Sequence, residues 1–520
     1  MRRGIAIQVV GEQRRECRSL NLARCGGTLP KLVVAFLLVG SGHAGPDAQR
    51  LVYGTYFGGR DKECSTGIAV GHSGDAYIVG RTPSPDFPVT PGAFSTKTSV
   101  NNNDWAGFVS RISPHGNRLV YSSFIGGNFR SSANAIAVDS QGRAFVAGST
   151  CSSVFPTTKT AVLRAPLGSR KVDACDGFLA GLSADGSQLE YATYLGGSAE
   201  DSATAIALRP SGDVIYVGGY TSSSDFPVTP SAFQNKLEGA TNGFFLAIDI
   251  QSGRLIYSTY LGGTGNDRVT GIAVDANERV YVSGVTDSVT WPKLRLARIG
   301  KLGKTDGFVA RFDMKGRVAP FGIRIGGAGE ESLDAISLDS AGDIYVVGCT
   351  NSTNFPVKGI NRAHVGGGFV SKLSGKRFDT GIPALVWSRR FGGSGDDALL
   401  AVSAGMQGSV FVSGRSGSKD LPTTAGAFYR QLWTENDSVL ARFRASDGRL
   451  QFATFVGGTR LPASWYNDEA TGVVATRNGD VYVTGCSLDN RVPISVGALQ
   501  PHPKGNSEPF VLRIAFAPSD

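Results

Sequence analysis

The sequence predicts an all-β fold, namely a seven-bladed β-propeller whose blades are four-stranded antiparallel sheets. Its composition is that of strands and tight turns, with 70 Gly, 28 Phe and 15 Tyr against 3 Met. Short apolar runs bounded by Gly, Pro, Asn and Asp recur, and no long segment places apolar residues at helical spacing. A unit of roughly 65 to 70 residues occurs seven times, and self-similarity at a fixed period is typical of stacked or radial repeat architectures.

Residues 1–44 are predicted to be a signal peptide or leader rather than part of the fold. Seven basic residues precede the apolar run at 32–39, and the segment 41–44 supplies small residues for cleavage near Ala44. The apolar run is shorter than the about 20 residues that cross a membrane. We therefore expect an exported bacterial protein, periplasmic, secreted or at the cell surface, with no membrane span in the mature chain. A retained anchor is the alternative. Residues 45–50 form a short linker.

The charge of the chain lies mostly in this leader. Its seven basic and two acidic residues carry +5 of the formal +9, which leaves +4 on the rest. Nucleic-acid and acidic-lipid partners need clustered Lys and Arg, so we expect a mixed surface and no such partner. We also expect a monomer.

The repeated unit opens on a strand in which an aromatic residue stands five positions before a glycine pair. In the cleanest copy these are Tyr257 and Gly262-Gly263. The aromatic position is occupied in turn by Tyr53, Tyr121, Tyr191, Tyr257, Phe321, Trp387 and Phe452. Apolar runs at 271–274 and 280–284 follow in this copy, then a longer loop with an apolar residue before proline, then a closing strand from Phe308. The units span about 51–118, 119–188, 189–254, 255–317, 318–383, 384–449 and 450–520.

Packing considerations assign these strands to positions in a blade. Radial arrangement buries both faces of a four-stranded sheet and leaves only short edges. The run typified by Ile272-Ala273-Val274 has a small central residue that suits the crowded axis, so it is predicted to be innermost. The aromatic strand is predicted to be outermost, where rings fill the wider wedge. With the strands assigned in this way, the first strand, at 51–57, pairs with the last, at 510–515, and closes the ring.

These motifs closely resemble those of a known bacterial family. The segments LIYSTYLGG at 255–263, GIAVD at 271–275 and DFPVTPSAF at 225–233 are similar to the SBBP repeat, a seven-bladed β-propeller repeat. The resemblance covers the chain after residue 50. It implies an exported or cell-surface propeller, often a module of larger envelope proteins, and it implies no established activity. The departures are the strand at 320–324 and an insertion at 461–468.

A candidate binding surface follows from the topology. Loops between blades and loops between the second and third strands emerge on one face, which collects the glycine pairs and the long proline loops. Exposed aromatic residues there can stack on sugar rings or anchor a protein. The candidates are Trp465, Tyr466, Trp105 and Trp433, whereas Trp291 replaces the Phe of the proline motif and is expected in the core.

Acidic residues stand five positions before the inner-strand Ile or Val in six of the seven units. They are Glu63, Asp201, Asp267, Glu331, Asp397 and Asp468, and Ser131 takes the place in the second unit. Because the strands that follow these acids are predicted to be innermost, the acids are expected around one mouth of the central channel. Such a ring of oxygens can hold Ca²⁺. The alternative is that each acid accepts hydrogen bonds from its own turn.

Catalytic motifs are not found in the sequence. The five histidines are scattered without metal-ligand spacing, and there is no nucleophile motif, phosphate-binding glycine loop or Cys-x-x-Cys. We therefore expect a non-enzymatic binding or structural module of the cell envelope with a protein or glycan ligand and no cofactor unless Ca²⁺. The alternative is a polysaccharide-acting hydrolase or lyase that uses a carboxylate pair at the channel mouth.

Five cysteines follow the leader. Cys151 and Cys175 bracket the long loop of the second unit and form a disulfide or remain two buried thiols. Cys64 and Cys486 lie on units that meet at ring closure, so a bond between them is conceivable, whereas Cys349 and Cys486 lie on units that do not meet.

Overall fold

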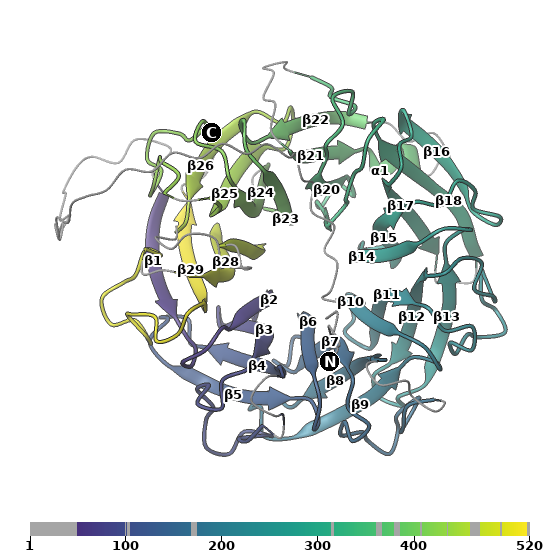
Figure 1. Cartoon of the computed structure of the whole chain (residues 1–520), viewed down its shortest axis with the longest axis horizontal. Coiled ribbons are helices and arrows are strands. Elements are labelled where there is room, and N and C mark those ends of the chain that lie inside the picture. The colour runs from purple at the N-terminus through teal and green to yellow at the C-terminus, as the bar shows by residue number, and fades with distance from the viewer. Residues whose placement is uncertain are drawn as a thin grey trace, which may run out of the picture.

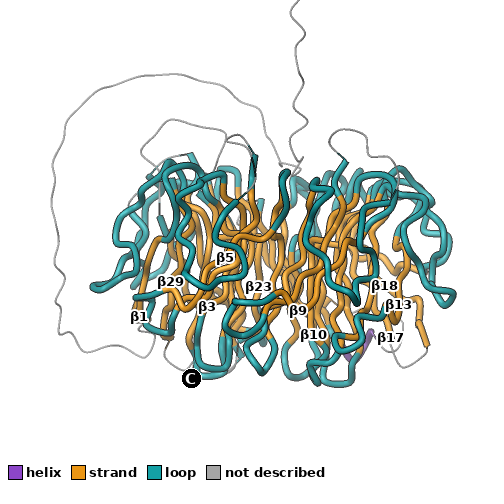
Figure 2. The backbone as a smooth tube through the Cα atoms, turned by 90° about the horizontal axis from the view of Figure 1, so that it is seen from below, coloured by secondary structure: helices purple, strands orange, loops and turns teal. Residues whose placement is uncertain are grey.

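The computed structural model describes residues 49–516 apart from 99, 101–103, 168–173, 314–316, 360–366, 379–384, 406–407, 434, 458–467 and 489–490. The described chain forms seven sheets arranged like spokes around a central axis (Figure 1). From the side the ring is a disc with strands through its thickness and loops on both faces (Figure 2). The predicted all-β, seven-bladed propeller is confirmed.

The strands of each blade follow one another from the axis outward. Blade 1 holds β2 (Cys64–Val70), β3 (Ala76–Thr82), β4 (Ala106–Ile112) and β5 (Leu119–Ile125), and blade 2 holds β6 (Ser131–Val138), β7 (Ala144–Thr150), β8 (Asp176–Leu182) and β9 (Leu189–Leu195). Blade 3 holds β10 (Asp201–Leu208), β11 (Val214–Thr221), β12 (Asn242–Asp249) and β13 (Leu255–Leu261). Blade 4 holds β14 (Asp267–Val274), β15 (Arg279–Thr286), β17 (Asp306–Asp313), β18 (Arg317–Gly326) and β16 (Arg295–Gly300).

The remaining blades have the same order. Blade 5 holds β19 (Ala335–Leu338), β20 (Ile344–Cys349), β21 (Gly368–Leu373) and β22 (Leu385–Phe391), with the single-turn α1 (Gly375–Phe378) after β21. Blade 6 holds β23 (Asp397–Ala404), β24 (Ser409–Ser416), β25 (Asp437–Arg444) and β26 (Leu450–Phe455). Blade 7 holds β27 (Glu469–Ala475), β28 (Asp480–Ser487), β29 (Glu508–Phe516) and β1 (Gln49–Tyr56).

The predicted order of the strands within a blade, from innermost to outermost, is therefore correct. The strands with the small central residue are innermost, and their hydroxyl groups link neighbouring blades. Thr204 Oγ1 of blade 3 donates to the Val269 carbonyl oxygen of blade 4 at 2.6 Å, and Thr471 Oγ1 of blade 7 donates to the Ser65 carbonyl oxygen of blade 1 at 2.9 Å. Small side chains allow the inner strands to approach closely enough for these bonds.

Ring closure also follows the prediction. β1 pairs with β29 in antiparallel register, with Tyr53 opposite Arg513 and Thr55 opposite Val511. The strand nearest the start of the described chain thus completes the sheet nearest its end. The edge that an open blade 7 would expose is paired, as edge protection requires.

Aromatic residues of the outer strands fill the wedges between blades. Tyr121 of blade 1 is 1% exposed and its ring lies against Gly186, in the β8–β9 turn of blade 2. Gly186 has a φ of 72°, and a Cβ built there would lie 2.3 Å from the ring. Tyr53 against Gly116 and Trp387 against Gly448 repeat the arrangement. The outermost position predicted for these strands is thus explained by an aromatic ring that locks one blade onto the next.

The long proline loops do not stay on the face where they begin. In blade 1 the loop runs down the rim, where Thr90 N donates to the Ser122 carbonyl oxygen and Phe124 N donates to the Ser95 carbonyl oxygen, both at 3.0 Å. Its tip reaches the opposite side of the disc, because Phe94 N bonds the carbonyl oxygen of Gly186 at 2.9 Å. The expectation that these loops lie wholly on one face is corrected: their middles cover the free edge of the outer strand, whose backbone groups need partners.

Blade 4 departs from the predicted four strands. Its long loop forms β16, which pairs in parallel with β18 from Arg295 opposite Phe321 to Gly300 opposite Gly326. The loop lacks the VTP segment that folds over the edge in blades 1 and 3. A strand occupies the same edge instead, so blade 4 has five strands.

Candidate functional site

The surface of interest is the loop face, defined as the glycine-pair loops between blades and the first residues of each long loop. These segments are bound to each other in a repeated way. In blade 3, Ser198 N donates to Asp225 Oδ1 and Ala199 N donates to Ser223 Oγ, each at 2.8 Å. Blade 6 has the equivalent bonds from Ser394 N to Asp420 Oδ1 and from Gly395 N to Ser418 Oγ, also at 2.8 Å. The loop face is thus a rigid, hydrogen-bonded platform.

The predicted acidic residues hold this platform together from below. Asp201 Oδ2 accepts hydrogen bonds from Gly197 N and from Ser223 Oγ, both at 2.8 Å, so one carboxylate joins the glycine loop to the long loop. Asp267 and Asp397 accept from the same two positions of their own blades. All six acids, Glu63, Asp201, Asp267, Glu331, Asp397 and Asp468, are at most 2% exposed. They lie beneath the loops, not on the open wall of the channel mouth.

Burial changes the protonation of these acids. Loss of hydration raises the pKa of Asp201 and of Glu63 to about 7, although hydrogen bonds from neighbouring hydroxyl and N–H groups oppose the shift. Burial raises the pKa of Asp267, Glu331 and Asp397 as well. Ca²⁺ binding by this set stays a prediction, and it requires the carboxylates to exchange the donors of their own blade for the ion.

Of the predicted aromatic residues, the two that the structure describes, Trp105 and Trp433, lie on separate blades. Trp105, immediately before β4, is half-buried with the Arg81 guanidinium 4.9 Å from its ring centroid. Trp433, before β25, is 50% exposed with the Arg491 guanidinium 4.3 Å from its ring. Trp465 and Tyr466 lie outside the described residues. Trp291 packs against Phe308 at 4.9 Å between centroids, as expected of a substitute for the motif Phe.

A cavity that the sequence did not indicate opens between blades 1 and 2. It has a volume of about 190 Å³ and is lined by Ser95, Lys97, Thr98, Ala106, Phe124, Ile125, Gly126, Gly127, Asn128 and Val154. Val154 is 61% exposed, and Phe129, which follows the lining Asn128, is 45% exposed. The cavity thus combines exposed apolar side chains with hydroxyl, amide and ammonium groups. Its only signal in the sequence is a Phe in the glycine loop of blade 2, where other copies have small or polar residues.

A disulfide lies close to this cavity. Cys151 and Cys175, the pair singled out in the sequence, are bonded to each other across the base of the blade 2 loop. Cys151 N also donates to the Arg130 carbonyl oxygen at 2.8 Å, which ties the loop to the glycine-pair segment that carries Phe129. The long loop of blade 2, including Val154, is therefore held at both of its ends.

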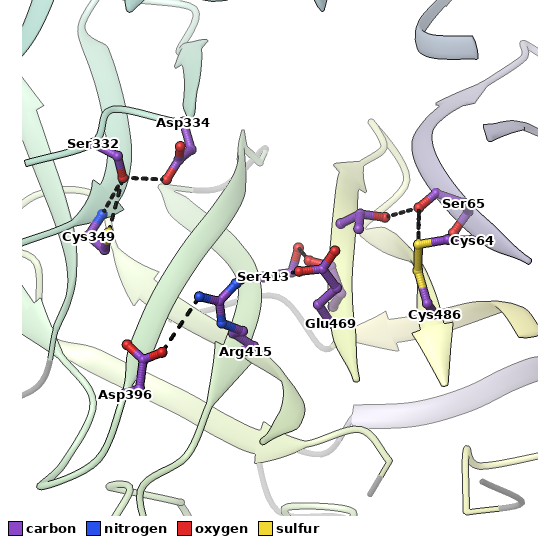
Figure 3. A network of polar contacts seen from close by, with 12 residues as sticks. Cys64, Ser65, Ser332, Asp334, Cys349, Asp396, Ser413, Arg415, Glu469 and Cys486 are labelled. Atoms are coloured by element: carbon purple, nitrogen blue, oxygen red, sulfur yellow. Dashed lines mark hydrogen bonds and ion pairs between the residues drawn. A yellow bond between two sulfur atoms is a disulfide. The ribbon is translucent and has the colours of Figure 1, made fainter. Parts of the chain in front are cut away.

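A polar network follows the inner strands of blades 5, 6, 7 and 1 (Figure 3). Arg415 of β24 lies between Asp396 and Glu469, with nitrogen to oxygen distances of 3.6 Å to each. Beyond Glu469 lies a second disulfide, between Cys64 and Cys486. The sulfurs and a Glu469 oxygen lie within 4.8 Å of one another, but sulfurs bonded to each other are not the thiolates that bind metals. This cluster therefore joins blades and is not a metal centre in the oxidised protein.

No helix among the described residues has the length and hydropathy needed to cross a membrane.

The fold and its loop face define a seven-bladed β-propeller whose blades are repeated copies of one motif. The SBBP β-propeller repeat matches residues 190–227 and 256–289, within blades 2 to 4 of the ring. The chain therefore carries SBBP repeats within a seven-bladed β-propeller, as the sequence motifs indicated.

Individual relatives are more distant. The chain is 26% identical to the regulatory protein FlaEY of Caulobacter vibrioides over 292 residues, which are 55% of this chain and 30% of that protein. It therefore spans less than a third of the relative that it matches. It is also similar to hydrazine synthase of Kuenenia stuttgartiensis, with 12% identity and a TM-score of 0.43 over 81% of this chain and 92% of that chain. A protein of unknown function from Dyadobacter fermentans has 11% identity and a TM-score of 0.42 over 90% and 99% of the two chains.

Proposed function

We propose that this protein is an exported, non-enzymatic binding module of the bacterial cell envelope, and that its loop face holds a protein or glycan ligand. The observation that carries the proposal is the cavity between blades 1 and 2 together with two exposed apolar side chains, Val154 in its lining and Phe129 next in sequence to the lining Asn128, which we call its apolar rim. Exposed aromatic and aliphatic groups beside hydroxyl and amide groups suit a sugar ring or a peptide side chain. At about 190 Å³ the cavity is small, so it fits one unit of a polymer better than a large cofactor.

Rigidity of the surrounding loops supports a binding role. The loop that carries Val154 is closed by the Cys151–Cys175 disulfide, and Ser152 Oγ in the same loop donates to Asn128 Oδ1 at 2.8 Å. A preorganised surface loses little conformational entropy when a ligand binds. Trp433, half-exposed on the long loop of blade 6, offers a second aromatic contact on the same face.

Export is supported by two independent features. The leader at 1–44 has the basic and apolar regions of a signal peptide, and four of the five remaining cysteines are paired in disulfides. Disulfides form and persist in oxidising compartments such as the periplasm and the cell surface. The match to FlaEY covers less than a third of that protein, so it supports a shared stretch of sequence and not a shared activity.

The enzymatic alternative gains less support. A polysaccharide hydrolase needs two acids that face the substrate, and the six acids of the predicted ring are buried and hydrogen-bonded to their own blades. These carboxylates stabilise the platform, and their positions do not favour contact with a polymer.

Binding of the labelled protein to glycan and peptide arrays tests the proposal. A Phe129→Ser/Val154→Ser variant removes the apolar rim, and Trp433→Ala removes the second contact. We expect the rim variant to lose affinity by roughly tenfold or more, as removal of a buried aromatic anchor does. Ile256→Ser is the matched control, because Ile256 is 37% exposed on β13, away from the loop face. Binding that is absent from both arrays, or that is indifferent to both loop-face variants, would refute the proposal.

A further inference from the structure

The outer edge of blade 4 differs from the other outer edges of the ring. In the other blades the long loop folds over the outer strand and bonds its backbone, as Thr158 N does with the Ala192 carbonyl oxygen in blade 2 and Thr229 N does with the Ser258 carbonyl oxygen in blade 3. In blade 4 the added strand β16 lies at the rim outside β18 (Figure 1). Within the described part of the chain, the side of β16 away from β18 has no backbone partner.

This edge strand is held firmly in place. Leu296 packs into the core between blades 3 and 4, whereas Ala297 and Ile299 pack into the core between blades 4 and 5. Successive side chains of a strand point to opposite faces, so β16 is anchored on both. Its outward N–H and C=O groups are therefore fixed in the extended geometry that accepts a further strand.

The charge along this edge has a single sign. Lys293, Arg295, Arg298, Lys301 and Lys304 fall within twelve residues, and no Asp or Glu occurs from 288 to 305. Lys293, Arg298, Lys301 and Lys304 are exposed. In the described residues none of these four side chains has an ion-pair partner. Charged residues on edge strands also discourage aggregation. Positive and negative residues can both do this, so protection against aggregation does not explain why all five charged residues here are basic.

We propose that the free edge of β16 is a docking site for an acidic peptide segment in extended conformation, which adds to blade 4 as a sixth strand. Main-chain hydrogen bonds to β16 supply the affinity, and Asp or Glu side chains of the segment meet the Lys and Arg side chains of the edge and select it. This surface lies on the rim and is separate from the loop face, so it can be occupied while a ligand is bound there.

Fluorescence anisotropy with a labelled peptide of alternating Glu and Thr, about eight residues long like a typical strand, tests the proposal at low ionic strength. We expect binding to the full chain, and affinity lower by roughly tenfold or more for Arg298→Glu/Lys301→Glu, since each reversed charge turns an attraction into a repulsion. Lys159→Glu/Lys236→Glu is the matched control, because it reverses two exposed lysines on the long loops of blades 2 and 3. This control and the Phe129→Ser/Val154→Ser variant are expected to bind like the original protein.

Two further probes separate strand addition from general attraction to anions. A peptide methylated on every backbone nitrogen keeps its charge but cannot pair with β16, and it is expected to bind at least about tenfold more weakly. Dextran sulfate is expected to compete only weakly. Equal affinity of the methylated peptide, binding of dextran sulfate without binding of the peptide, or no binding of the peptide at all would overturn the proposal. Arg298→Gln/Lys301→Gln, with a circular dichroism spectrum of each variant, distinguishes loss of the site from loss of the fold.

Discussion

Cys64 and Cys486 form a disulfide that joins the innermost strand of blade 1 to the second strand of blade 7, although the two residues are 422 positions apart in the chain. On the rim, β1 pairs with β29 and completes blade 7. The ring is therefore closed twice, by a covalent bond near the axis and by a strand pairing at the circumference. Either closure restrains blade 1 and blade 7 against separation.

Removal of the covalent closure is expected to destabilise the ring at this seam. For Cys64→Ser/Cys486→Ser we expect the free energy of unfolding to fall by about 2–4 kcal/mol, the usual contribution of a native disulfide. Amide hydrogen exchange is expected to increase in β2 and β28. Cys151→Ser/Cys175→Ser is the control, because that bond closes a loop within blade 2 and leaves the seam intact. Unchanged exchange at the seam in the first variant would contradict a closing role.

The contact between Tyr121 and Gly186 makes a second prediction. Gly186→Ala adds a Cβ at 2.3 Å from the ring and places alanine at a φ of 72°, so it combines a clash with backbone strain. Gly212→Ala isolates the strain, since Gly212 has a φ of 78° and nothing within 4 Å of its Cβ position. We expect about 1 kcal/mol of destabilisation for Gly212→Ala and clearly more for Gly186→Ala, measured by denaturant unfolding. Equal losses of stability in the two variants would show that the Tyr121 ring moves aside without a free-energy cost.

The buried acids predict how stability depends on pH. Because burial raises the pKa of Asp201 and Glu63 to about 7, the folded protein keeps their protons in a range where the unfolded chain has lost them. Stability therefore falls as pH rises from about 4 to about 7 and levels off above, with a slope of at most about 1.4 kcal/mol per pH unit for each group. Thermal melts at intervals from pH 5 to pH 8 measure this slope.

Asp201→Asn is expected to reduce the slope of stability against pH by the contribution of the Asp201 carboxyl, because the amide does not ionise in this range. Glu238→Gln, at an exposed position on the long loop of blade 3, is the control and is expected to leave the profile unchanged. A melting temperature that rises between pH 5 and pH 7 in the original protein would contradict the expected fall in stability.

The leader makes a prediction about location. When the full chain is expressed in a bacterium, we expect the mature protein to begin near residue 45 and to be found outside the cytoplasm with two disulfides. Leu37→Arg interrupts the apolar run and is expected to leave the uncleaved, reduced protein in the cytoplasm. Intact mass and cell fractionation measure both outcomes. A cytoplasmic mature form in the unaltered protein would remove the case for export.

Local periodicity and packing are enough to predict the ring. The apolar run at 271–274, with its small central residue, is innermost as expected, and the pairing of the first and last strands follows from the order of strands within a unit. Both depend on residue size and alternation, which a sequence displays directly. The acidic positions are also visible, because they recur with the unit, and hydrogen bonding within each turn is one of the two interpretations that their spacing allows.

Features that depend on where the long loops fold are not predicted. The long loop of blade 1 runs down the rim because Thr90 and Ser95 form backbone hydrogen bonds with an outer strand about thirty residues further on. The long loop of blade 4 lacks those bonds and forms β16 instead. Neither is visible as a local pattern. The cavity beside Val154 likewise arises where two loops leave space between them. For the same reason the aromatic candidates chosen by type, Trp105 and Trp433, lie on separate blades.

The pairing of β1 with β29 also has a consequence for synthesis. Translation produces β1 before every other described strand, while its partner is the last of them to leave the ribosome. The nascent chain therefore carries an unmatched strand until β29 has been synthesised, and no shorter length can close the ring. Ring closure thus waits for the last blade, and a tag fused just ahead of residue 49 would sit at the seam.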